Sequence, residues 1–532
     1  MKLWLTWLVG LSALGLAGCG SAGSPTPVRA VHRHGLMSIL QSDAALNSNP
    51  QAVIAAAKAL GVQALRVNVL WSATVRDPTT PHPPAGFVAS DPASPDYDFA
   101  ALDSIDRFAA AAHLRLYLTL TSPVPLWAAT PYHGPRYLAQ HWRPSAADFG
   151  AWVTAVGRRY SGAYTPPGAS GPLPRVNMWS LWNEPNYGPN LAPQALPGTV
   201  HGARVIIDTS APQYRRLLAA GWRALAATGH RPGSDTILIG ETAPHGELNP
   251  GLDNMTPPLQ FLRDLYCVSD TYQPLSGAAA QAEDCPSVGA AGFVSANPAL
   301  FDASGWADHP YPAGHPPNEL TGEPSQTEGY ADFARLDNLE TALQRAAAAW
   351  GTHARLSIYD TEFGYWTRPP ANASVPNAVS LGTAARDINW AEYLTWKNPE
   401  VASYDQYLLT DPPVGSSSHF VTGIEFADGT PKPQLYDAYR LALWLPRTTG
   451  RSLEVWGCAR PVQSGSGAHT VAVQYAAGGS AFHTVARATL HPASSGCYFD
   501  IHVTFPGAGA VRLAYASAAG PVISRVQTIS GP

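Results

Sequence analysis

Short runs of β-forming residues alternate with helical patterns along most of this 532-residue chain, and this alternation limits the possible folds more than any other feature. Repeated strand–helix units favour a parallel sheet whose strands are connected by helices. The expected strands are one within residues 31–40 and others at 62–71, 114–121, 176–182, 236–242, 306–309, 355–361 and 401–409. Eight strands close a (β/α)8 barrel, or TIM barrel. An open doubly wound sheet alternates similarly, but no Gly-rich phosphate-binding loop follows an early strand.

The helical patterns end near residue 451. Beyond it, short alternating runs separated by Gly, Ser, Ala and Pro occur at 470–475, 484–490, 498–505, 511–515 and 522–528. Such runs predict a small antiparallel β-sandwich. We therefore expect an α/β chain with a barrel at residues 31–447 and a sandwich domain at residues 448–532. Trp456 is the only tryptophan of the second domain, so packing against the barrel is favoured over ligand binding as its role.

The N-terminus has the pattern of an export signal. An apolar run at residues 3–17 follows a lysine and is too short to span a membrane comfortably. It leads into the motif LAGC at residues 16–19, which resembles a bacterial lipobox with Cys19 as the acylated residue. We expect a signal peptide at 1–19 and a linker at 20–30. The protein is then exported and either held at the extracellular face of the cell membrane by a lipid or, if the cysteine is accidental, secreted.

Cysteine spacing agrees with export. Removing the lipidated cysteine from the total of five leaves an even number, and exported proteins form disulfides. The remaining four fall into two local pairs, Cys267 with Cys285 and Cys458 with Cys497. Bridges within each pair are favoured over bridges that cross the domains. The cysteines and histidines do not have the spacing of a zinc site, so no structural metal is expected.

Composition excludes one class of partner. The formal net charge is -5, whereas binding to nucleic-acid phosphates needs a dense basic surface, so no nucleic acid is expected. Hydrophobic residues make up 45% of the chain, enough for a large core. No metal or organic cofactor is expected, and the chain is expected to act as a monomer.

Three of the expected barrel strands end in a glutamate: Glu184, Glu241 and Glu362. TIM-barrel active sites lie at the C-terminal ends of the strands. Two carboxyl groups that face each other across the barrel mouth can hydrolyse a glycosidic bond, because one donates a proton to the leaving oxygen while the other attacks the anomeric carbon. The three glutamates are therefore the candidates for this chemistry.

The sequence around these glutamates resembles a known glycosidase clan. Glu184 stands in the motif WNEP at 182–185, Glu362 in TEFG at 361–364, and the motif HPY at 309–311 precedes the second of them. In this order the motifs resemble the clan with catalytic glutamates on strands 4 and 7, which includes families 5 and 39. The pattern is nearest to family 39. The resemblance implies a retaining hydrolase of O-glycosidic bonds in oligo- or polysaccharides.

The resemblance also implies roles for individual residues. Glu184 would be the acid/base and Glu362 the nucleophile. Arg66 and Tyr311 would hold the nucleophile, and Asn183 would contact the sugar 2-hydroxyl. The remaining residues expected to contact substrate are His309, Trp127, Trp366 and Glu241. Core packing is the alternative for each tryptophan, bracing a loop is the alternative for His309, and tuning the pKa of a neighbour is the alternative for Glu241.

Two departures from the clan pattern affect the expected substrate. The end of strand 3 reads SPVPLW at 122–127 and lacks the familiar histidine, and the end of strand 8, SYDQY at 403–407, lacks a tryptophan under the reacting sugar. The sugar, its linkage and the choice between exo and endo cleavage therefore stay open. A catalytically silent glycan-binding lipoprotein and a transglycosidase that remodels envelope polysaccharide are the alternative functions.

Overall fold

The structure is a computed structural model that describes residues 36–200, 202–320, 322, 327–371, 375–413, 420–462, 469–492, 496–517 and 520–530. The predicted signal peptide, the linker and the proposed lipidation site Cys19 lie outside these residues. Within the described residues, no helix is both long enough and apolar enough to cross a membrane.

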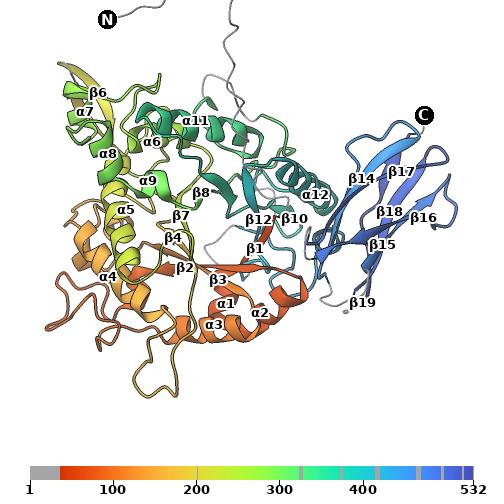
Figure 1. Ribbon diagram of the computed structural model, residues 1–532, viewed down its shortest axis with the longest axis horizontal. Helices are drawn as coiled ribbons and strands as arrows, with labels where there is room; N and C mark the ends of the chain where they lie inside the picture. The colour runs from red at the N-terminus through yellow and green to blue at the C-terminus, as the bar shows by residue number, and fades with distance from the viewer. Residues whose placement is uncertain are drawn as a thin grey trace, which may run out of the picture. The chain divides into compact units, whose positions relative to one another are not determined.

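Eight parallel strands form a closed barrel, which confirms the predicted TIM-barrel fold (Figure 1). Around the barrel the order is β1-β12-β9-β8-β7-β4-β3-β2, so each strand lies beside the preceding barrel strand in the sequence. The strands are β1 (Met37–Gln41), β2 (Ala64–Leu70), β3 (Arg115–Thr121), β4 (Met178–Leu181), β7 (Thr236–Thr242), β8 (Gly305–Asp308), β9 (Ser357–Asp360) and β12 (Val401–Tyr407).

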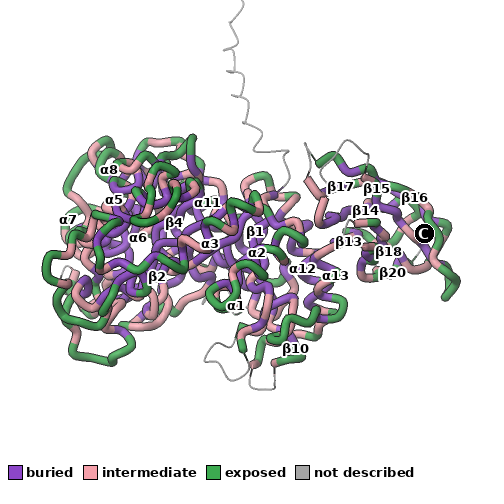
Figure 2. The backbone as a smooth tube through the Cα atoms, turned by 90° about the horizontal axis from the view of Figure 1, so that it is seen from below, coloured by how far each residue is buried: buried purple, intermediate pink, exposed green. Residues whose placement is uncertain are grey.

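Helices connect the strands and cover the outside of the barrel. They are α1 (Asp43–Ser48), α2 (Pro50–Ala59), α3 (Ala100–Ala111), α4 (Ala146–Arg159), α5 (Ser210–Ala227), α6 (Pro258–Leu265), α7 (Gly277–Ala282), α8 (Ala290–Ala296), α9 (Ala299–Asp302), α11 (Leu336–Ala349), α12 (Leu381–Lys397) and α13 (Leu435–Arg440). In α4, the Ser145 side chain caps the N-terminus by accepting from the Asp148 amide at 3.3 Å. Trp152 and Val156 on one face of α4 are fully buried, and Figure 2 shows buried segments concentrated in the barrel.

Two small insertions add short strands. A hairpin of β5 (Ala195–Val200) and β6 (Ala203–Asp208) follows β4, and β10 (Thr367–Arg368) pairs with β11 (Val379–Ser380) after β9.

The barrel interior changes from apolar to polar along the strands. Its apolar layer consists of Ile39, Ala64, Tyr117, Met178, Leu238 and Ala307, all buried. Side chains two positions further along a strand point to the same side. Ala64 is therefore followed inside the barrel by Arg66, and Tyr117 by Thr119. This alternation places charged and polar groups above the apolar layer, at the end where the three glutamates lie.

Antiparallel sheets follow the barrel, as predicted. One sheet has the order β13-β14-β17 and the other β16-β15-β18-β19, with β20 paired to β18. The strands are β13 (Leu441–Trp444), β14 (Ser452–Ala459), β15 (His469–Ala476), β16 (His483–Leu490), β17 (Tyr498–Thr504), β18 (Gly509–Ser517), β19 (Gly520–Ile523) and β20 (Gln527–Ile529). Side chains from both sheets share one core, which makes the domain a sandwich.

Strands β13 and β14 are not among the runs predicted from the sequence, and the predicted run at 522–528 is divided between β19 and β20. Strand β13 belongs to the first sheet of the sandwich although it ends before residue 448. The domain boundary at residue 448 stays a prediction.

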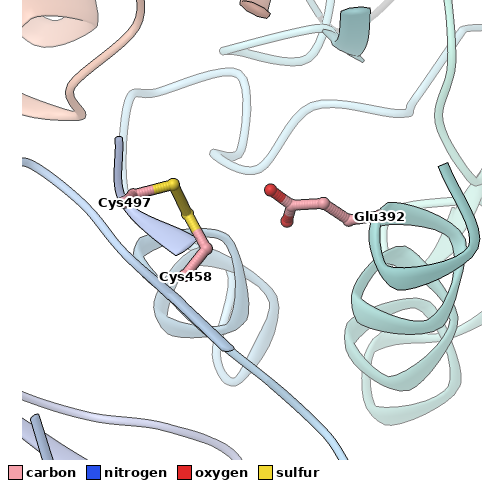
Figure 3. A group of neighbouring side chains, drawn as sticks. All are labelled: Glu392, Cys458 and Cys497. Atoms are coloured by element: carbon pink, nitrogen blue, oxygen red, sulfur yellow. A yellow bond between two sulfur atoms is a disulfide. The ribbon is translucent and has the colours of Figure 1, made fainter. Parts of the chain in front are cut away.

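Both predicted disulfides are present, Cys267–Cys285 and Cys458–Cys497. The second lies beside a buried ion pair that joins the barrel to the sandwich. Glu392 extends from α12 toward this disulfide (Figure 3), and its carboxylate accepts hydrogen bonds from Arg460 and from the Tyr498 hydroxyl, the latter at 2.9 Å. Both charged side chains are almost completely buried. Such a pair costs free energy to desolvate, so each charge depends on its partner.

Replacing Arg460 with Met leaves Glu392 buried without its counter-charge. We expect the free energy of unfolding to fall by about 3–5 kcal/mol, measured by urea denaturation. A second substitution, Glu392→Met, removes the orphaned charge and should recover most of the loss. The control is Arg355→Met, since Arg355 is 58% exposed in its pair with Glu400 and its loss should cost less than about 1 kcal/mol. A double variant that is less stable than Arg460→Met alone would contradict the ion-pair account.

Candidate active site

The three glutamates lie together at the C-terminal end of the barrel. Glu184 follows β4, Glu362 follows β9, and Glu241 is the penultimate residue of β7. The structure thus brings the predicted carboxylates to the end of the barrel where TIM-barrel active sites are found.

The backbone near two of these glutamates is strained. Trp182, Glu184 and Glu241 have φ values of 85°, 41° and 47°, which non-glycine residues adopt at a cost. Gly240 has a φ of 91°, and a Cβ atom there would lie 2.4 Å from the Trp306 ring. The Glu184 amide donates to the Glu241 carbonyl at 2.9 Å and ties the two strand ends together. Strain of this kind is concentrated at functional sites.

Glu184 and Glu362 face each other. Three atoms all lie within 4.8 Å of one another: one carboxylate oxygen of Glu184, one carboxylate oxygen of Glu362 and one ring nitrogen of His309. The Tyr311 hydroxyl donates to Glu362 Oε2 at 3.0 Å, and Asn190 Nδ2 donates to Glu184 Oε2 at 3.1 Å. The two carboxylate side chains are 18% and 9% exposed, so Glu184 is the more accessible to solvent.

His309 lies between the two carboxylates. Its Nδ1 is 2.9 Å from Glu184 Oε1 and 3.8 Å from Glu362 Oε2. Burial by itself would lower the pKa of His309, but the two carboxylates outweigh it and raise the pKa above the ordinary value. His309 therefore links the two glutamates electrostatically.

Arg66 is the cation of the site and is fully buried. Its Nη1 donates to Glu362 Oε1 at 2.6 Å, and its Nη2 donates to Glu241 Oε2 at 2.6 Å and to Asn183 Oδ1 at 2.8 Å. Gln41 accepts a further hydrogen bond from Nη1. Burial opposes the charge, but Glu241 and Glu362 outweigh it and raise the pKa of Arg66 well above its usual range. Arg66 therefore bridges two carboxylates, one from β7 and one from the end of β9, which are separated in the barrel by β8.

Glu241 lies below the barrel mouth and is fully buried. Its Oε1 accepts hydrogen bonds from the Tyr117 hydroxyl and from Thr119 Oγ1, the latter at 3.0 Å, while Oε2 accepts from Arg66. Protein groups therefore surround the carboxylate. This setting fits the alternative role of tuning a neighbouring group better than direct contact with substrate.

Trp366 belongs to an aromatic group beside the nucleophile candidate. Its ring centroid is 5.5 Å from that of Tyr311 and 5.2 Å from that of Phe420. Tyr407, at the end of β12, contacts the same two neighbours. This position leaves an aromatic face near the site, where it would suit a sugar ring, and the stacking role of Trp366 stays a prediction.

Trp127 lies in a different setting. Its ring packs edge-on against Trp71 at 5.9 Å and against Phe87 at 5.7 Å. Neither neighbour takes part in the hydrogen bonds of the glutamates. The core-packing alternative therefore fits Trp127 better than a substrate platform.

Sequence reasoning missed Gln41, Tyr117 and Asn190 as members of the site. Two of them had a signal, because Gln41 is the register partner of Arg66 in the adjacent strand and Tyr117 alternates with Thr119 on the inward face of β3. Asn190 had none, since its position depends on the loop after β4.

Among the described residues, two groups are close enough to hold a metal ion. The first is Glu184, His309 and Glu362, whose oxygens and Nδ1 already pair with one another, Arg66 or neighbouring donors. The second is Glu392 with two cysteines whose sulfurs form a disulfide. Neither group offers a set of uncommitted ligands.

No protein-family model and no curated protein sequence matches the chain. Among solved structures, it is similar to a glucosidase from Croceicoccus marinus, with 13% identity over 94% of each chain and a TM-score of 0.47. A family 39 glycoside hydrolase from Bacteroides cellulosilyticus WH2 has 12% identity over 94% of this chain and 80% of its own, with a TM-score of 0.43. An endo-1,4-beta-mannanase from Rhizomucor miehei has 13% identity over 74% and 90%, with a TM-score of 0.36. Because these identities and TM-scores are low, the fold assignment rests on the strand order of this chain. The functional proposal rests on the geometry of its site.

The contact at Gly240 predicts a stability effect. Gly240→Ala introduces both a strained φ and a clash with the Trp306 ring, so the free energy of unfolding should fall by about 2–4 kcal/mol, measured by urea denaturation. The matched control is Gly233→Ala, which has a φ of 97° but no atom within 4 Å of the added Cβ. Equal losses in the two variants would show that the ring contact contributes nothing.

Proposed function

We propose that the protein is a retaining glycoside hydrolase in which Glu362 is the nucleophile and Glu184 the acid/base. The observation that carries the proposal is the pair of carboxylate oxygens within 4.8 Å of each other, one from each glutamate, at the C-terminal end of the barrel. Retaining enzymes hold their carboxyl groups about 5 Å apart, whereas inverting enzymes need about 6.5–9.5 Å to admit a water molecule between substrate and base.

The environments of the two glutamates support different roles. Glu362 accepts hydrogen bonds from Arg66 and Tyr311, which hold its carboxylate in a fixed position, as a nucleophile needs. Glu184 is more exposed, and its partners are Asn190 and His309. An exposed carboxyl can exchange protons with solvent and with an incoming water molecule, as an acid/base must.

The proposed reaction has two steps. Glu362 attacks the anomeric carbon and forms a glycosyl ester, while the glycosidic C–O bond breaks and the leaving oxygen takes the proton of Glu184. In the second step Glu184 removes a proton from water, the water oxygen attacks the same carbon, and the bond to Glu362 breaks. The sugar leaves with its original anomeric configuration, and both carboxyl groups return to their starting states.

The substrate class that fits this chemistry is an oligo- or polysaccharide, with Trp366 beside the site as a surface for a sugar ring. We further propose export and attachment to the cell membrane through a lipid on Cys19. The motif at residues 16–19 and the two disulfides support export.

Glutamine variants of both glutamates test this proposal. Protein beginning at Gly20 is incubated with a panel of glycans, and the products are read by mass spectrometry. Glu362→Gln and Glu184→Gln should each lower turnover by at least about a hundredfold. Glu319→Gln, a variant of a half-exposed glutamate outside the site, should keep full activity. Turnover that survives Glu362→Gln would contradict the nucleophile assignment, and sugar transfer to added acceptors in place of hydrolysis would indicate a transglycosidase.

Glu241 is assigned a positioning role through Arg66. Asp43 and Asp405 also lie near Arg66, but burial raises the pKa of both carboxyl groups. They therefore compete weakly for the guanidinium, which is left to Glu241 and Glu362. Sharing the cation in this way keeps Glu362 from being bound too tightly to attack.

Glu241→Gln should move the acidic limb of the kcat/KM profile to lower pH, on the order of one unit, and lower kcat. The reason is that the whole guanidinium charge then acts on Glu362 and stabilises its ionised form. The pH profile is the decisive measurement, because a purely structural role would change stability without moving the limb. Glu319→Gln serves as the control for loss of one carboxylate. If the acidic limb of the kcat/KM profile of Glu241→Gln stays at the wild-type pH, the positioning role of Glu241 is contradicted.

A further inference from the structure

A cavity of about 680 Å³ lies between the barrel and the sandwich, and none of its lining residues belongs to the candidate active site. Its walls come from the first part of α12, the residue before α13, the end of β13 and the segment that connects β19 to β20. The lining residues that matter here are Gly382, Arg386, Gln434, Trp444, Arg525 and Gln527. A volume of this size is within the usual range for small-molecule sites.

Arg525 is a half-buried cation without a carboxylate partner. Its Nε donates to Asn389 Oδ1 at 3.1 Å, and its Nη2 donates to the Leu443 carbonyl and to Gln527 Oε1. Within the described ranges, Nη1 has no hydrogen-bond partner, and no carboxylate lies within 4.0 Å of the guanidinium. The guanidinium stands over the Trp444 ring, 5.5 Å from its centroid, which fixes its position.

Among the described residues, the fully buried arginines do not show this deficit. Arg66 and Arg460 each pair with a carboxylate. Arg215 lacks an ion pair, but its Nη1 and Nη2 donate to four backbone carbonyls. Burial and the neighbouring charge of Arg386 lower the pKa of Arg525 to about 10, so it still carries its charge at neutral pH.

Arg386 brings a second guanidinium to the cavity. Its Nε and Nη2 donate to the two oxygens of Asp387 at 2.6 and 2.8 Å, while its Nη1 has no partner in the part of the chain that the structure describes. The side chain is 46% exposed. With one carboxylate between two guanidinium groups, the cavity carries an excess positive charge. Gly382, in the first turn of the 17-residue helix α12, adds the positive end of the helix dipole.

The other walls can bind neutral polar groups. Gln434 is exposed, and its side chain makes no hydrogen bond to any described residue. Ser524 and Thr528 add hydroxyl groups to the lining. Amide and hydroxyl donors around an anion site are suited to a ligand that carries hydroxyl groups next to its negative charge.

We propose that this cavity binds a carboxylated saccharide, with the carboxylate held by the free Nη1 atoms of Arg386 and Arg525. The saccharide part of this assignment rests on the proposed function, whereas the anion part rests only on the two guanidinium groups and the cavity. Sulfate or phosphate esters of sugars share the oxyanion chemistry, and the test adds glucose 6-phosphate and glucose 6-sulfate, compared with glucuronate, to separate these sources of the anion. The sandwich domain then contributes to ligand binding, in addition to its packing against the barrel.

Calorimetric titration of the protein beginning at Gly20 tests the assignment. Three probes are compared: trigalacturonate, the neutral trisaccharide maltotriose, and inorganic phosphate. We expect trigalacturonate to bind at least about tenfold more tightly than maltotriose, because of two charge-assisted hydrogen bonds, and its affinity to fall with salt. Arg386→Gln should weaken binding by about tenfold or more. Because Arg386 also pairs with the buried Asp387, urea denaturation of each variant checks that the protein used in the titration is folded. Arg355→Gln removes one exposed charge elsewhere as a control.

Three results would overturn the proposal. Equal binding of maltotriose would exclude recognition of the anion, and binding unaffected by Arg386→Gln would place the ligand elsewhere. Phosphate binding as tightly as trigalacturonate would show an oxyanion site without a saccharide component. The Glu362→Gln variant should bind trigalacturonate as the wild type does, so loss of turnover and loss of this site are distinguishable.

Discussion

A single buried guanidinium organises the polar end of this barrel. Arg66 contacts Glu362 from the end of β9, Glu241 from β7, Asn183 from the end of β4 and Gln41 from β1. A charge removed from water must be compensated by its surroundings. The strand ends that surround Arg66 therefore have to supply carboxylate and amide oxygens. The same requirement brings the candidate nucleophile to a fixed position beneath the barrel mouth.

The apolar layer below Arg66 makes this arrangement accessible to sequence reasoning. Strands of a TIM barrel alternate inward and outward residues, so the residue two places after a buried alanine or tyrosine faces the interior. The strand runs, the closed barrel and the glutamates at the strand ends follow from periodicity. The places of Arg66 and Tyr311 beside Glu362 follow from the resemblance to the glycosidase clan. Both disulfides follow from local cysteine spacing.

The rest depends on contacts between distant segments. Whether Glu241 faces substrate or protein is decided by Tyr117 and Thr119, and no local pattern shows that these side chains enclose it. Trp127 and Trp366 look equivalent in sequence, yet one packs against Trp71 and the other against Tyr311. The cavity at Arg386 requires segments more than 130 residues apart in the sequence, which periodicity does not connect.

The position of Glu392 has a consequence for modularity. This carboxylate belongs to a barrel helix, but its counter-charge and one hydrogen-bond donor come from Arg460 and Tyr498 of the sandwich. A barrel cut free at its C-terminal boundary would expose an apolar face with an unpaired acid at its centre. The barrel and the sandwich therefore behave as one inseparable unit, and a gene fusion or shuffling event that exchanged either half would have to replace the ion pair as a whole.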